Sequence, residues 1–560
     1  MSETAIFPSG LSSLQGPALE TEQGLGSLTL PGFMTEIAER FGEREALCWR
    51  DLQGQVQRWS YADMHAQCRK VAKALIAAGC GRGSRVGVLV SNRPEWLFSA
   101  FGAAMAGATC VAMNTFSTQS ELQYQLQHAD IEFLIIEAGV ASKDFIGDVL
   151  SLCPGLPGGD GRYSNPDYPF LRRVVCIDDD QAREGIQAWS QFLNGGDGLG
   201  DELVDAASQA ADALDRGLIF FSSGSTALPK AIQQTQRAAM MQCWRFGQWY
   251  GVDKDVRTWS ANGFFWSGNF AMAFGSTLTV GGCLVLQRFF DPDEAVQLFV
   301  DEKVSLPIAW PHQEARLTEC PAWNDADLSA MKYVDANLVL ATHPAIKSSW
   351  RQPNGYGMTE TFTFIVGDCG DRVPAGTHGP VLPGNTVRII NPDSGELLPV
   401  GQSGEITVKG PTLSPGYLKI APETTFDEDG FMRSGDCGHF TEDGFLVWEG
   451  RLSDTIKTGG ANVSPTEIDA VLCKHPAVQS TFTVGVPHDT LGEIVVSCVL
   501  VRDGKTLEVD ELRAYAKQYL ASYKVPREVL FFDEEELPMT GSNKIQRPEL
   551  KKMAQARLEV

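Results

Sequence analysis

The sequence predicts an α/β protein with a large N-terminal domain of mostly parallel sheets covered by helices, a small antiparallel β subdomain, and a small α+β C-terminal domain. Strand and helix patterns alternate from residue 60 to residue 136, which is typical of a parallel sheet. Residues 376–418 alternate β-branched runs with Gly and Pro turns, which is typical of antiparallel strands. The 560 residues, 43% of them hydrophobic, exceed the roughly 250 to 300 residues of a single core.

The alternation begins with a helix predicted from Ser60 to Gly79. Ser60 and Asp63 form a capping-box pattern, and Gly79 stands where a helix would stop. The next predicted elements are a strand at 86–90, a helix at 95–106, a strand at 109–113, a helix at 121–128 and a strand at 133–136. Residues 96–113 carry no charge, but Ala106-Gly107-Ala108 interrupts them, so a buried helix and strand are favoured over a membrane span.

Four segments are expected along the chain. Residues 1–30 are rich in Ser, Gly, Pro and Leu without periodicity, and we interpret them as a poorly structured N-terminal arm. Residues 31–450 form the large domain. The pattern changes at Gly450, so residues 451–456 are expected to be a linker. Residues 457–560 have the normal size of a small domain.

Composition limits the partners and the compartment. A formal charge of −24 argues against nucleic acid and anionic membrane surfaces as partners. The thirteen cysteines show no C-x-x-C and no paired Cys/His spacing, which favours reduced, mostly buried thiols over disulfides or zinc. The N-terminus lacks signal-peptide features, and the C-terminus carries no peroxisomal or retention signal. A cytoplasmic protein is therefore expected.

The stretch "FSSGSTALPKA" at 221–231 is the first chemical motif. It follows the apolar run 218–221, a predicted strand, and precedes a helical pattern from Arg237, so we interpret it as a strand-to-helix turn. Small residues, hydroxyls and one lysine suit a polyphosphate, although a flexible Ser/Gly surface loop has the same composition. It is not a Walker A loop, because Pro229 and Ala231 flank Lys230.

Together with four later motifs, this stretch resembles the adenylate-forming superfamily, which includes acyl-CoA synthetases, peptide-synthetase adenylation domains and beetle luciferases. The later motifs are "GYGMTE" at 355–360, "SGD" at 434–436, "GRLSDTIKTGGANVSPTEID" at 450–469 and "LPMTGSNKIQR" at 537–547. Five matches in the family's order extend the resemblance over nearly the whole chain.

The resemblance implies a site for ATP and Mg²⁺. The loop that would grip the β- and γ-phosphates contains Ser222, Ser223, Gly224, Ser225, Thr226 and Lys230. Tyr356 is implied to stack on adenine, Thr359 to meet the α-phosphate and Glu360 to bind the metal. Asp436 matches the ribose-binding carboxylate, and Arg451 matches a ribose or phosphate contact.

The remaining roles concern the acid, coenzyme A and domain movement. By resemblance, Lys544 is the catalytic lysine, Ser453 is the pivot between a large AMP-binding domain and a mobile C-terminal domain, and Gly459-Gly460 faces coenzyme A. The acid pocket is expected beside Phe265, Trp266 and Gly268, although Trp266 fits a plain core role equally well. The chain departs from the family pattern at Ser453, at Asn543 and in the 334–355 region, which looks shortened and where the family has adenine contacts.

The expected activity is that of an acid–CoA ligase, which activates a medium-chain, long-chain or bulky hydrophobic carboxylic acid with ATP and transfers the acyl group to coenzyme A. Two alternatives stay open. One is an adenylating enzyme that passes the acyl group to a carrier protein, or oxidises it as luciferases do; the other is a nucleotide-binding relative without catalysis. The expected partners are the acid, ATP and coenzyme A, and a homodimer is left open.

Overall fold

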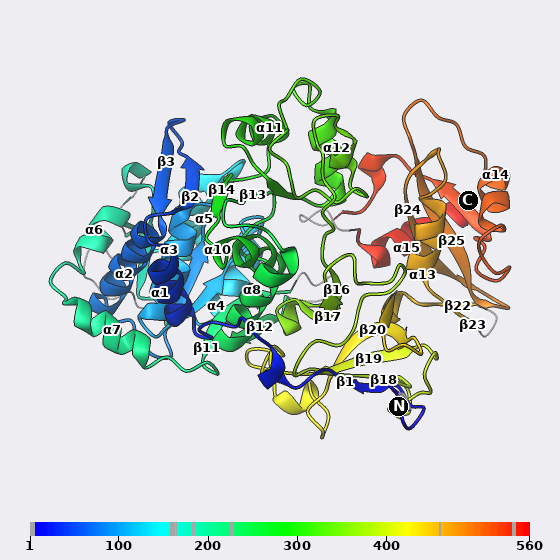
Figure 1. Ribbon diagram of the computed structural model, residues 1–560, viewed down its shortest axis with the longest axis horizontal. Helices are drawn as coiled ribbons and strands as arrows, with labels where there is room; N and C mark the ends of the chain where they lie inside the picture. Colours follow the sequence, from blue (N-terminus) through cyan, green and yellow to red (C-terminus); the bar gives the residue numbers. More distant parts are fainter. Residues whose placement is uncertain are drawn as a thin grey trace.

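Two mostly parallel sheets form the core of the large domain (Figure 1). The computed structural model describes residues 6–156, 163, 165–181, 183, 185–222, 229–458, 461–539 and 545–559, without the side chains of 461 and 462. The first sheet runs in the order β10 (Gln187–Ala188), β9 (Arg173–Cys176), β6 (Phe133–Ile136), β4 (Arg85–Leu89), β5 (Thr109–Ala112), β11 (Arg216–Phe221) and β12 (Ala231–Thr235). All its pairings are parallel except that of β11 with β12.

Helices cover both faces of this sheet, because alternate strand residues point to opposite sides. Phe133 and Ile135 of β6 belong to the core beneath α1 (Leu30–Phe41), α2 (Tyr61–Ala77), α3 (Pro94–Met105) and α8 (Gln236–Tyr250). Leu134 and Ile136 belong to the core beneath α4 (Gln119–His128) and α5 (Phe145–Leu152). Helix α2 begins at the predicted capping box of Ser60 and Asp63.

A second sheet adjoins the first and runs in the order β15 (Leu306–Ile308), β13 (Arg257–Ser260), β14 (Cys283–Leu286), β2 (Glu45–Arg50) and β3 (Val56–Ser60). Helices α11 (Pro292–Asp301) and α12 (Pro311–Glu319) lie over it, and α6 (Trp189–Asn194) and α7 (Asp201–Gln209) pack beside α2. Over the described part of the chain, every helix is too short or too polar to traverse a lipid bilayer. The uncharged stretch 96–113 is the buried pair α3 and β5, as predicted.

Antiparallel strands form the predicted subdomain in the order β1 (Ser13–Gln15), β18 (Thr386–Ile390), β19 (Gly404–Lys409), β20 (Met432–Phe440) and β21 (Leu446–Arg451). A hairpin of β16 (Asn354–Gly357) and β17 (Phe364–Asp368) lies between this sheet and the large sheets (Figure 1). The predicted α/β class is confirmed.

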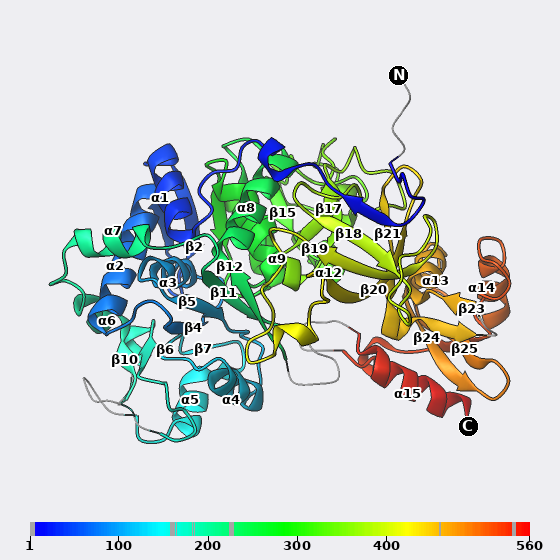
Figure 2. The same cartoon turned by 90° about the horizontal axis from the view of Figure 1, so that it is seen from below.

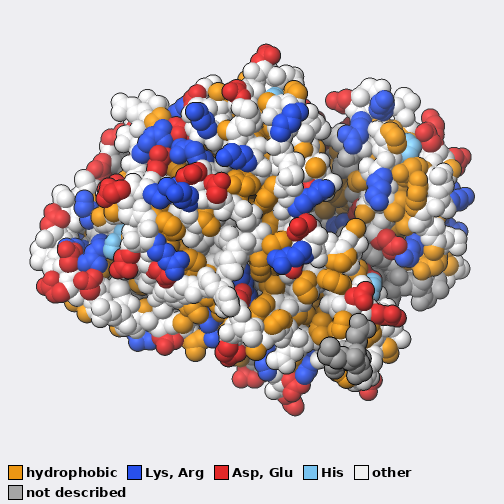
Figure 3. All heavy atoms as spheres, in the orientation of Figure 1, with side chains coloured by type: hydrophobic (Ala, Val, Ile, Leu, Met, Phe, Trp, Pro, Cys, Tyr) orange, Lys and Arg blue, Asp and Glu red, His pale blue; other side chains and the backbone are white. Residues whose placement is uncertain are grey.

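The C-terminal domain has its own sheet and its own apolar clusters. Its strands are β23 (Ala461–Val463), β22 (Ile456–Thr458), β25 (Gly492–Val501), β24 (Val478–His488) and β26 (Glu528–Phe531). Helices α13 (Pro465–Leu472) and α14 (Val509–Ala516) pack on one face, and α15 (Arg547–Leu558) packs on the other. Figure 3 shows a hollow between this domain and the large one, and positive and negative side chains are interspersed on the face shown.

The structure corrects the interpretation of the 221–231 stretch as a strand-to-helix turn. Ala231–Thr235 forms β12, which pairs antiparallel with β11, so the loop joins two strands of a hairpin. Helix α8 begins only at Gln236, and Thr235 caps it. Gln233 and Gln234 hid the strand from sequence analysis because they interrupt its apolar pattern, and Gln234 is nevertheless fully buried.

The structure also corrects the expectation of a poorly structured arm, as far as residues 6–30 are described. Residues Ser13–Gln15 form β1, which pairs with β18, and both ribbon views show the segment running from α1 to the antiparallel sheet (Figures 1 and 2). The Arg245 side chain, fully buried on α8, makes a two-point ion pair with Glu22, with both N···O distances 2.7 Å. These partners are far away in sequence, so local composition does not reveal them.

Replacing Glu22 with alanine is expected to destabilise the large domain by about 3 kcal/mol, because it leaves the Arg245 guanidinium buried without its counter-charge. Urea unfolding followed by tryptophan fluorescence measures the change. Glu20→Ala is the matched control, since Glu20 is exposed in the same segment, and its effect should stay within about 0.5 kcal/mol. Equal midpoints for the two variants would contradict the anchoring role of Glu22.

Candidate active site

Asp436 is the buried centre of the predicted nucleotide site. It lies on β20 opposite Arg451 of β21, and its side chain is almost completely buried. The Tyr356 hydroxyl donates to Asp436 Oδ2 at 2.7 Å, and Arg451 Nε lies 3.1 Å from Oδ1. Ser434 Oγ accepts from the Asp436 backbone N–H at 3.0 Å. Four of the residues that sequence analysis singled out therefore contact one another.

Two opposing effects act on the pKa of Asp436, and one of its carboxylate oxygens can still accept a hydrogen bond. Burial raises the pKa of its carboxyl, whereas Arg451 and the Tyr356 hydroxyl oppose that rise. Among the described residues, none makes a hydrogen bond to Oδ1, although the Arg451 guanidinium stands close to it. A carboxylate oxygen in this state suits a hydroxyl donor, as the predicted ribose contact requires.

A second cluster forms around Glu360, on the short helix η5 (Thr359–Thr361). The Tyr417 hydroxyl donates to Glu360 Oε1 at 2.8 Å, and Lys230 Nζ lies 4.6 Å from the centroid of the Tyr417 ring. Tyr417 thus connects the end of the predicted phosphate loop to the predicted metal ligand. Tyr417 lies in no motif that the sequence indicated. The turn dipeptide Pro415-Gly416 precedes it, and Gly416 has a φ of +120°.

The donor set around Glu360 fits the Mg²⁺ that accompanies ATP. A carboxylate oxygen is a hard ligand of the kind Mg²⁺ prefers. Glu360 is only partly buried, and Tyr417 bonds its carboxylate through Oε1. A partly exposed carboxylate in this position fits a role as metal ligand.

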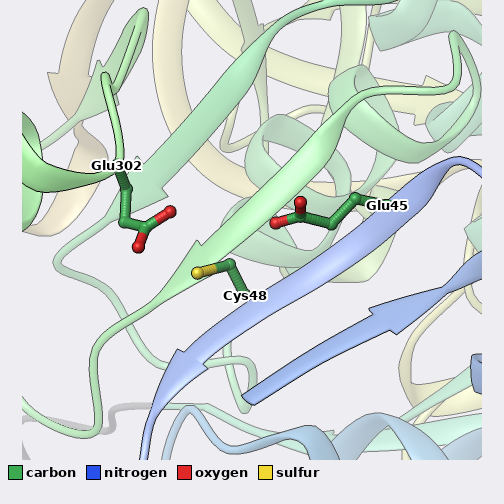
Figure 4. A group of neighbouring side chains, drawn as sticks. All are labelled: Glu45, Cys48 and Glu302. Carbon is green, nitrogen blue, oxygen red and sulfur yellow. The ribbon is translucent and has the colours of Figure 1, made fainter. Parts of the chain in front are cut away.

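Within the described ranges, Glu45, Cys48 and Glu302 have the spacing of another metal site, with ligand atoms within 4.8 Å of one another (Figure 4). Arg58 Nη1 takes the place a cation would need: it lies 2.7 Å from Glu45 Oε1, 3.2 Å from Cys48 Sγ and 2.9 Å from Glu302 Oε2. Arg257 contacts both carboxylates as well. We therefore interpret the group as an ion-pair network that joins β2, β3 and β13.

Aromatic rings line the region predicted to hold the acid. Trp266 stacks with Phe116 at a centroid distance of 6.3 Å and meets the edge of Phe265 at 4.9 Å. A Cβ at Gly268 would meet no atom within 4 Å, so open space lies beside it. Phe116, which follows β5, is a member of this group that sequence analysis did not identify.

A π-helix, η3 (Phe270–Gly275), follows these aromatics between the short helices α9 (Ser267–Asn269) and α10 (Ser276–Leu278). Widened turns of this kind leave carbonyls poorly paired and are frequent at functional sites. Here hydroxyls pair them: Thr277 Oγ1 donates to Ala273 O and Thr279 Oγ1 to Gly275 O, both at 2.6 Å.

The 334–355 region, predicted to be shortened, is held by Asp335, which is buried. Its carboxylate accepts from the backbone N–H groups of Asn337 and Gln352, each at 2.9 Å, and from Arg351 at 3.1 Å. The whole region is described, and its regular elements are the 3-10 helix η4 (Val339–Thr342) and the start of β16. Asp335 therefore holds the two ends of this segment together.

Several predicted site residues lie outside the described residues, namely Ser223, Gly224, Ser225, Thr226, Gly459, Gly460 and Lys544, together with Asn543. At the edges of the phosphate loop, Ser222 and Lys230 bond each other, with Ser222 Oγ accepting from the Lys230 backbone N–H at 3.0 Å. In the linker, Ser453 Oγ donates to Asp454 Oδ1 at 3.1 Å. Asp454 Oδ2 lies 3.6 Å from Nε of Arg547, a residue of α15.

The AMP-binding enzyme family matches residues 34–418, and the AMP-binding enzyme C-terminal domain matches residues 467–544. The chain belongs to the AMP-binding enzyme family. It is 28% identical to a putative acyl-CoA synthetase, YngI, of Bacillus subtilis (93% of this chain, 96% of that protein) and 29% identical to a feruloyl-CoA synthase of Amycolatopsis (88% and 93%). ATP-bound MatB of Rhodopseudomonas palustris shares the fold with a TM-score of 0.76 at 25% identity (94% and 99%). The predicted resemblance to acyl-CoA synthetases of the adenylate-forming superfamily is confirmed.

Tyr356→Phe is expected to destabilise this AMP-binding enzyme by about 2 kcal/mol at pH 7, because Asp436 loses a hydrogen bond made to its charged form. Loss of this hydrogen bond also raises the pKa of Asp436 in the folded state. A carboxyl group with a raised pKa destabilises the folded state while it is charged and does not do so while it is protonated. The destabilisation by Tyr356→Phe should therefore be largest at pH 7 and become smaller toward roughly pH 4.

Denaturant unfolding at both pH values measures the effect. Tyr250→Phe is the matched control: its hydroxyl is buried with no hydrogen-bond partner in the described part of the chain, so its removal should be neutral or stabilising. A Tyr356→Phe effect no larger than that of Tyr250→Phe would contradict the proposed electrostatics of Asp436.

Proposed function

We propose that the protein is an ATP-dependent acid–CoA ligase that forms an acyl-adenylate and then an acyl-CoA thioester. The observation that carries the proposal is the convergence of Lys230, Tyr417 and Glu360, because a loop lysine and a carboxylate at one place suit a magnesium triphosphate. Tyr356 stands four residues before Glu360, so its partner Asp436 belongs to the same nucleotide site.

In the first step an oxygen of the substrate carboxylate attacks the α-phosphorus of MgATP, and the bond from that phosphorus to the bridging oxygen of the β-phosphate breaks. Pyrophosphate leaves, and the acyl-adenylate remains. The protein positions the groups and balances charge. Lys544 is proposed to bridge the carboxylate and the α-phosphate, Thr359 to contact that phosphate, and Glu360 to hold Mg²⁺.

In the second step the thiol sulfur of coenzyme A attacks the acyl carbon, the bond from that carbon to the AMP oxygen breaks, and the thiol proton passes to solvent. We propose that the C-terminal domain turns about residues 451–456, which withdraws Lys544 and presents Gly459-Gly460 to the thiol. The separate apolar clusters of the small domain support movement as a unit.

The acid is proposed to be hydrophobic, of medium chain, long chain or bulky shape. Phe116, Phe265 and Trp266 would supply apolar ring surfaces, and the open space at Gly268 would admit the hydrocarbon part.

Acid-dependent exchange of labelled pyrophosphate into ATP tests the first step. Lys544→Ala is expected to abolish exchange while leaving thioester formation from supplied acyl-AMP largely intact. Glu360→Gln is expected to lower exchange about 10²-fold, because it removes a charge that neutralises Mg²⁺ at the reacting phosphates.

Each competing function has its own outcome in the same assay. Exchange without consumption of the coenzyme A thiol, restored by an acyl carrier protein, would indicate a carrier-loading enzyme. ATP binding without exchange, over a panel of carboxylic acids, would indicate a nucleotide-binding relative and overturn the ligase proposal.

Gly268→Leu is expected to lower kcat/KM about tenfold for the longest acid accepted and to leave short acids within about twofold, because the leucine fills open space. The exchange assay over a chain-length series measures this. Gly198→Leu is the matched control, an exposed glycine whose surroundings are equally open and far from the site. A uniform loss over all chain lengths would contradict a pocket role for Gly268.

A further inference from the structure

Two fully buried glutamines hold the turn that carries Thr359 and Glu360. Gln234 of β12 donates from its side-chain amide to the Thr359 carbonyl. Gln242 of α8 donates to the Phe364 carbonyl at 2.6 Å and to the Thr361 carbonyl at 3.4 Å. Both side chains have 0% exposure. Their bonds therefore bracket the segment from Thr359 to Phe364.

The bracketed turn is strained. Phe362 has a φ of +62°, a left-handed conformation that is rare for a bulky residue. Its ring is buried between Phe220 of β11, at a centroid distance of 5.8 Å, and Phe270 of η3, at 5.9 Å. Strained backbone persists only where the surroundings over-determine it. The glutamine amides help to hold this backbone conformation. Thr361 does so as well, because its hydroxyl donates to Thr363 O at 2.6 Å and accepts from Met358 N–H at 3.0 Å.

In the described part of the chain, each glutamine bonds the turn through its amide nitrogen and leaves its amide oxygen unpaired. Within the described residues, Oε1 of Gln234 and Oε1 of Gln242 have no partner although both are buried. A buried amide oxygen without a partner is unfavourable for stability, whereas each amide nitrogen pairs carbonyls that an apolar residue would leave unpaired. The two glutamines, one on β12 and one on α8, thus direct their hydrogen bonds to the same turn.

We propose that Gln234 and Gln242 are positioning residues that hold Glu360 against Tyr417 and the end of the phosphate loop, in the geometry that MgATP requires. This inference rests on the proposed function of the site. Gln234 stands on β12, four residues after Lys230, so the strand that ends the phosphate loop also holds the turn of the metal ligand. The distance between Lys230, at the end of the phosphate loop, and Glu360, on the turn, is thereby fixed.

Gln234→Leu and Gln242→Leu test the proposal, because leucine keeps the volume and removes the donor. Each variant is expected to lower kcat for acid-dependent pyrophosphate exchange at least tenfold, with the KM for the acid within about twofold. Calorimetric titration with ATP is expected to show weaker binding in the presence of Mg²⁺ and unchanged binding in its absence.

Gln236→Leu is the matched control. Gln236 lies between the two positions, is 3% exposed, and uses its Oε1 to accept from the Leu30 N–H instead of contacting the turn. It is expected to lower the unfolding midpoint without changing kcat or the Mg²⁺-dependent part of ATP binding.

The outcomes separate this inference from the proposed function. Wild-type kcat in folded Gln234→Leu and Gln242→Leu, or the same loss in Gln236→Leu, overturns the positioning role. If the wild-type protein binds MgATP without exchange, the ligase proposal fails, and the Mg²⁺-dependent binding of the variants still decides the positioning role. A wild-type protein that binds no MgATP overturns both.

Discussion

The packing of the Phe362 ring between Phe220 and Phe270 is the constraint on which the site depends. Phe220 belongs to the strand that enters the phosphate loop, and Phe270 begins the π-helix that follows Phe265 and Trp266. Phe362 itself follows Glu360 by two residues. Because buried aromatic cores deform little, one ring relates the proposed phosphate, acid and metal regions to one another. The left-handed backbone at Phe362 is the local cost of placing the ring there.

The antiparallel subdomain connects this rigid region to the C-terminal domain. Asp436 contacts Tyr356 of the central hairpin on one side and Arg451, the first residue of the linker, on the other. Three residues later, Asp454 contacts Arg547, which also pairs with Asp469 inside the small domain. Arg451 and Asp454, three residues apart, are thus paired with different parts of the chain.

Particular elements show why sequence analysis succeeded where it did. Helix α2 and its N-cap, Ser60 to Ala77, contain both the capping box and the apolar face, so this information was local. The motifs at 355–360 and 434–436 were recognisable because each is contiguous. Tyr417, Gln234 and Gln242 were not recognisable, since their partners lie about 57 to 125 residues away and nothing nearby marks them. The strand β12 was missed because its buried polar residues break the pattern that a buried strand usually shows.

The sequence by itself determined the α/β class, because that depends on short-range periodicity, and it determined the order of the chemical motifs, because each motif is contiguous and resembles its counterpart in the family. Only the tertiary structure decided that the phosphate loop closes a hairpin, that the N-terminal segment is anchored by Arg245, and that Tyr417 joins Lys230 to Glu360. Those outcomes depend on contacts between distant segments, whose energies are set by burial and charge pairing in the folded chain.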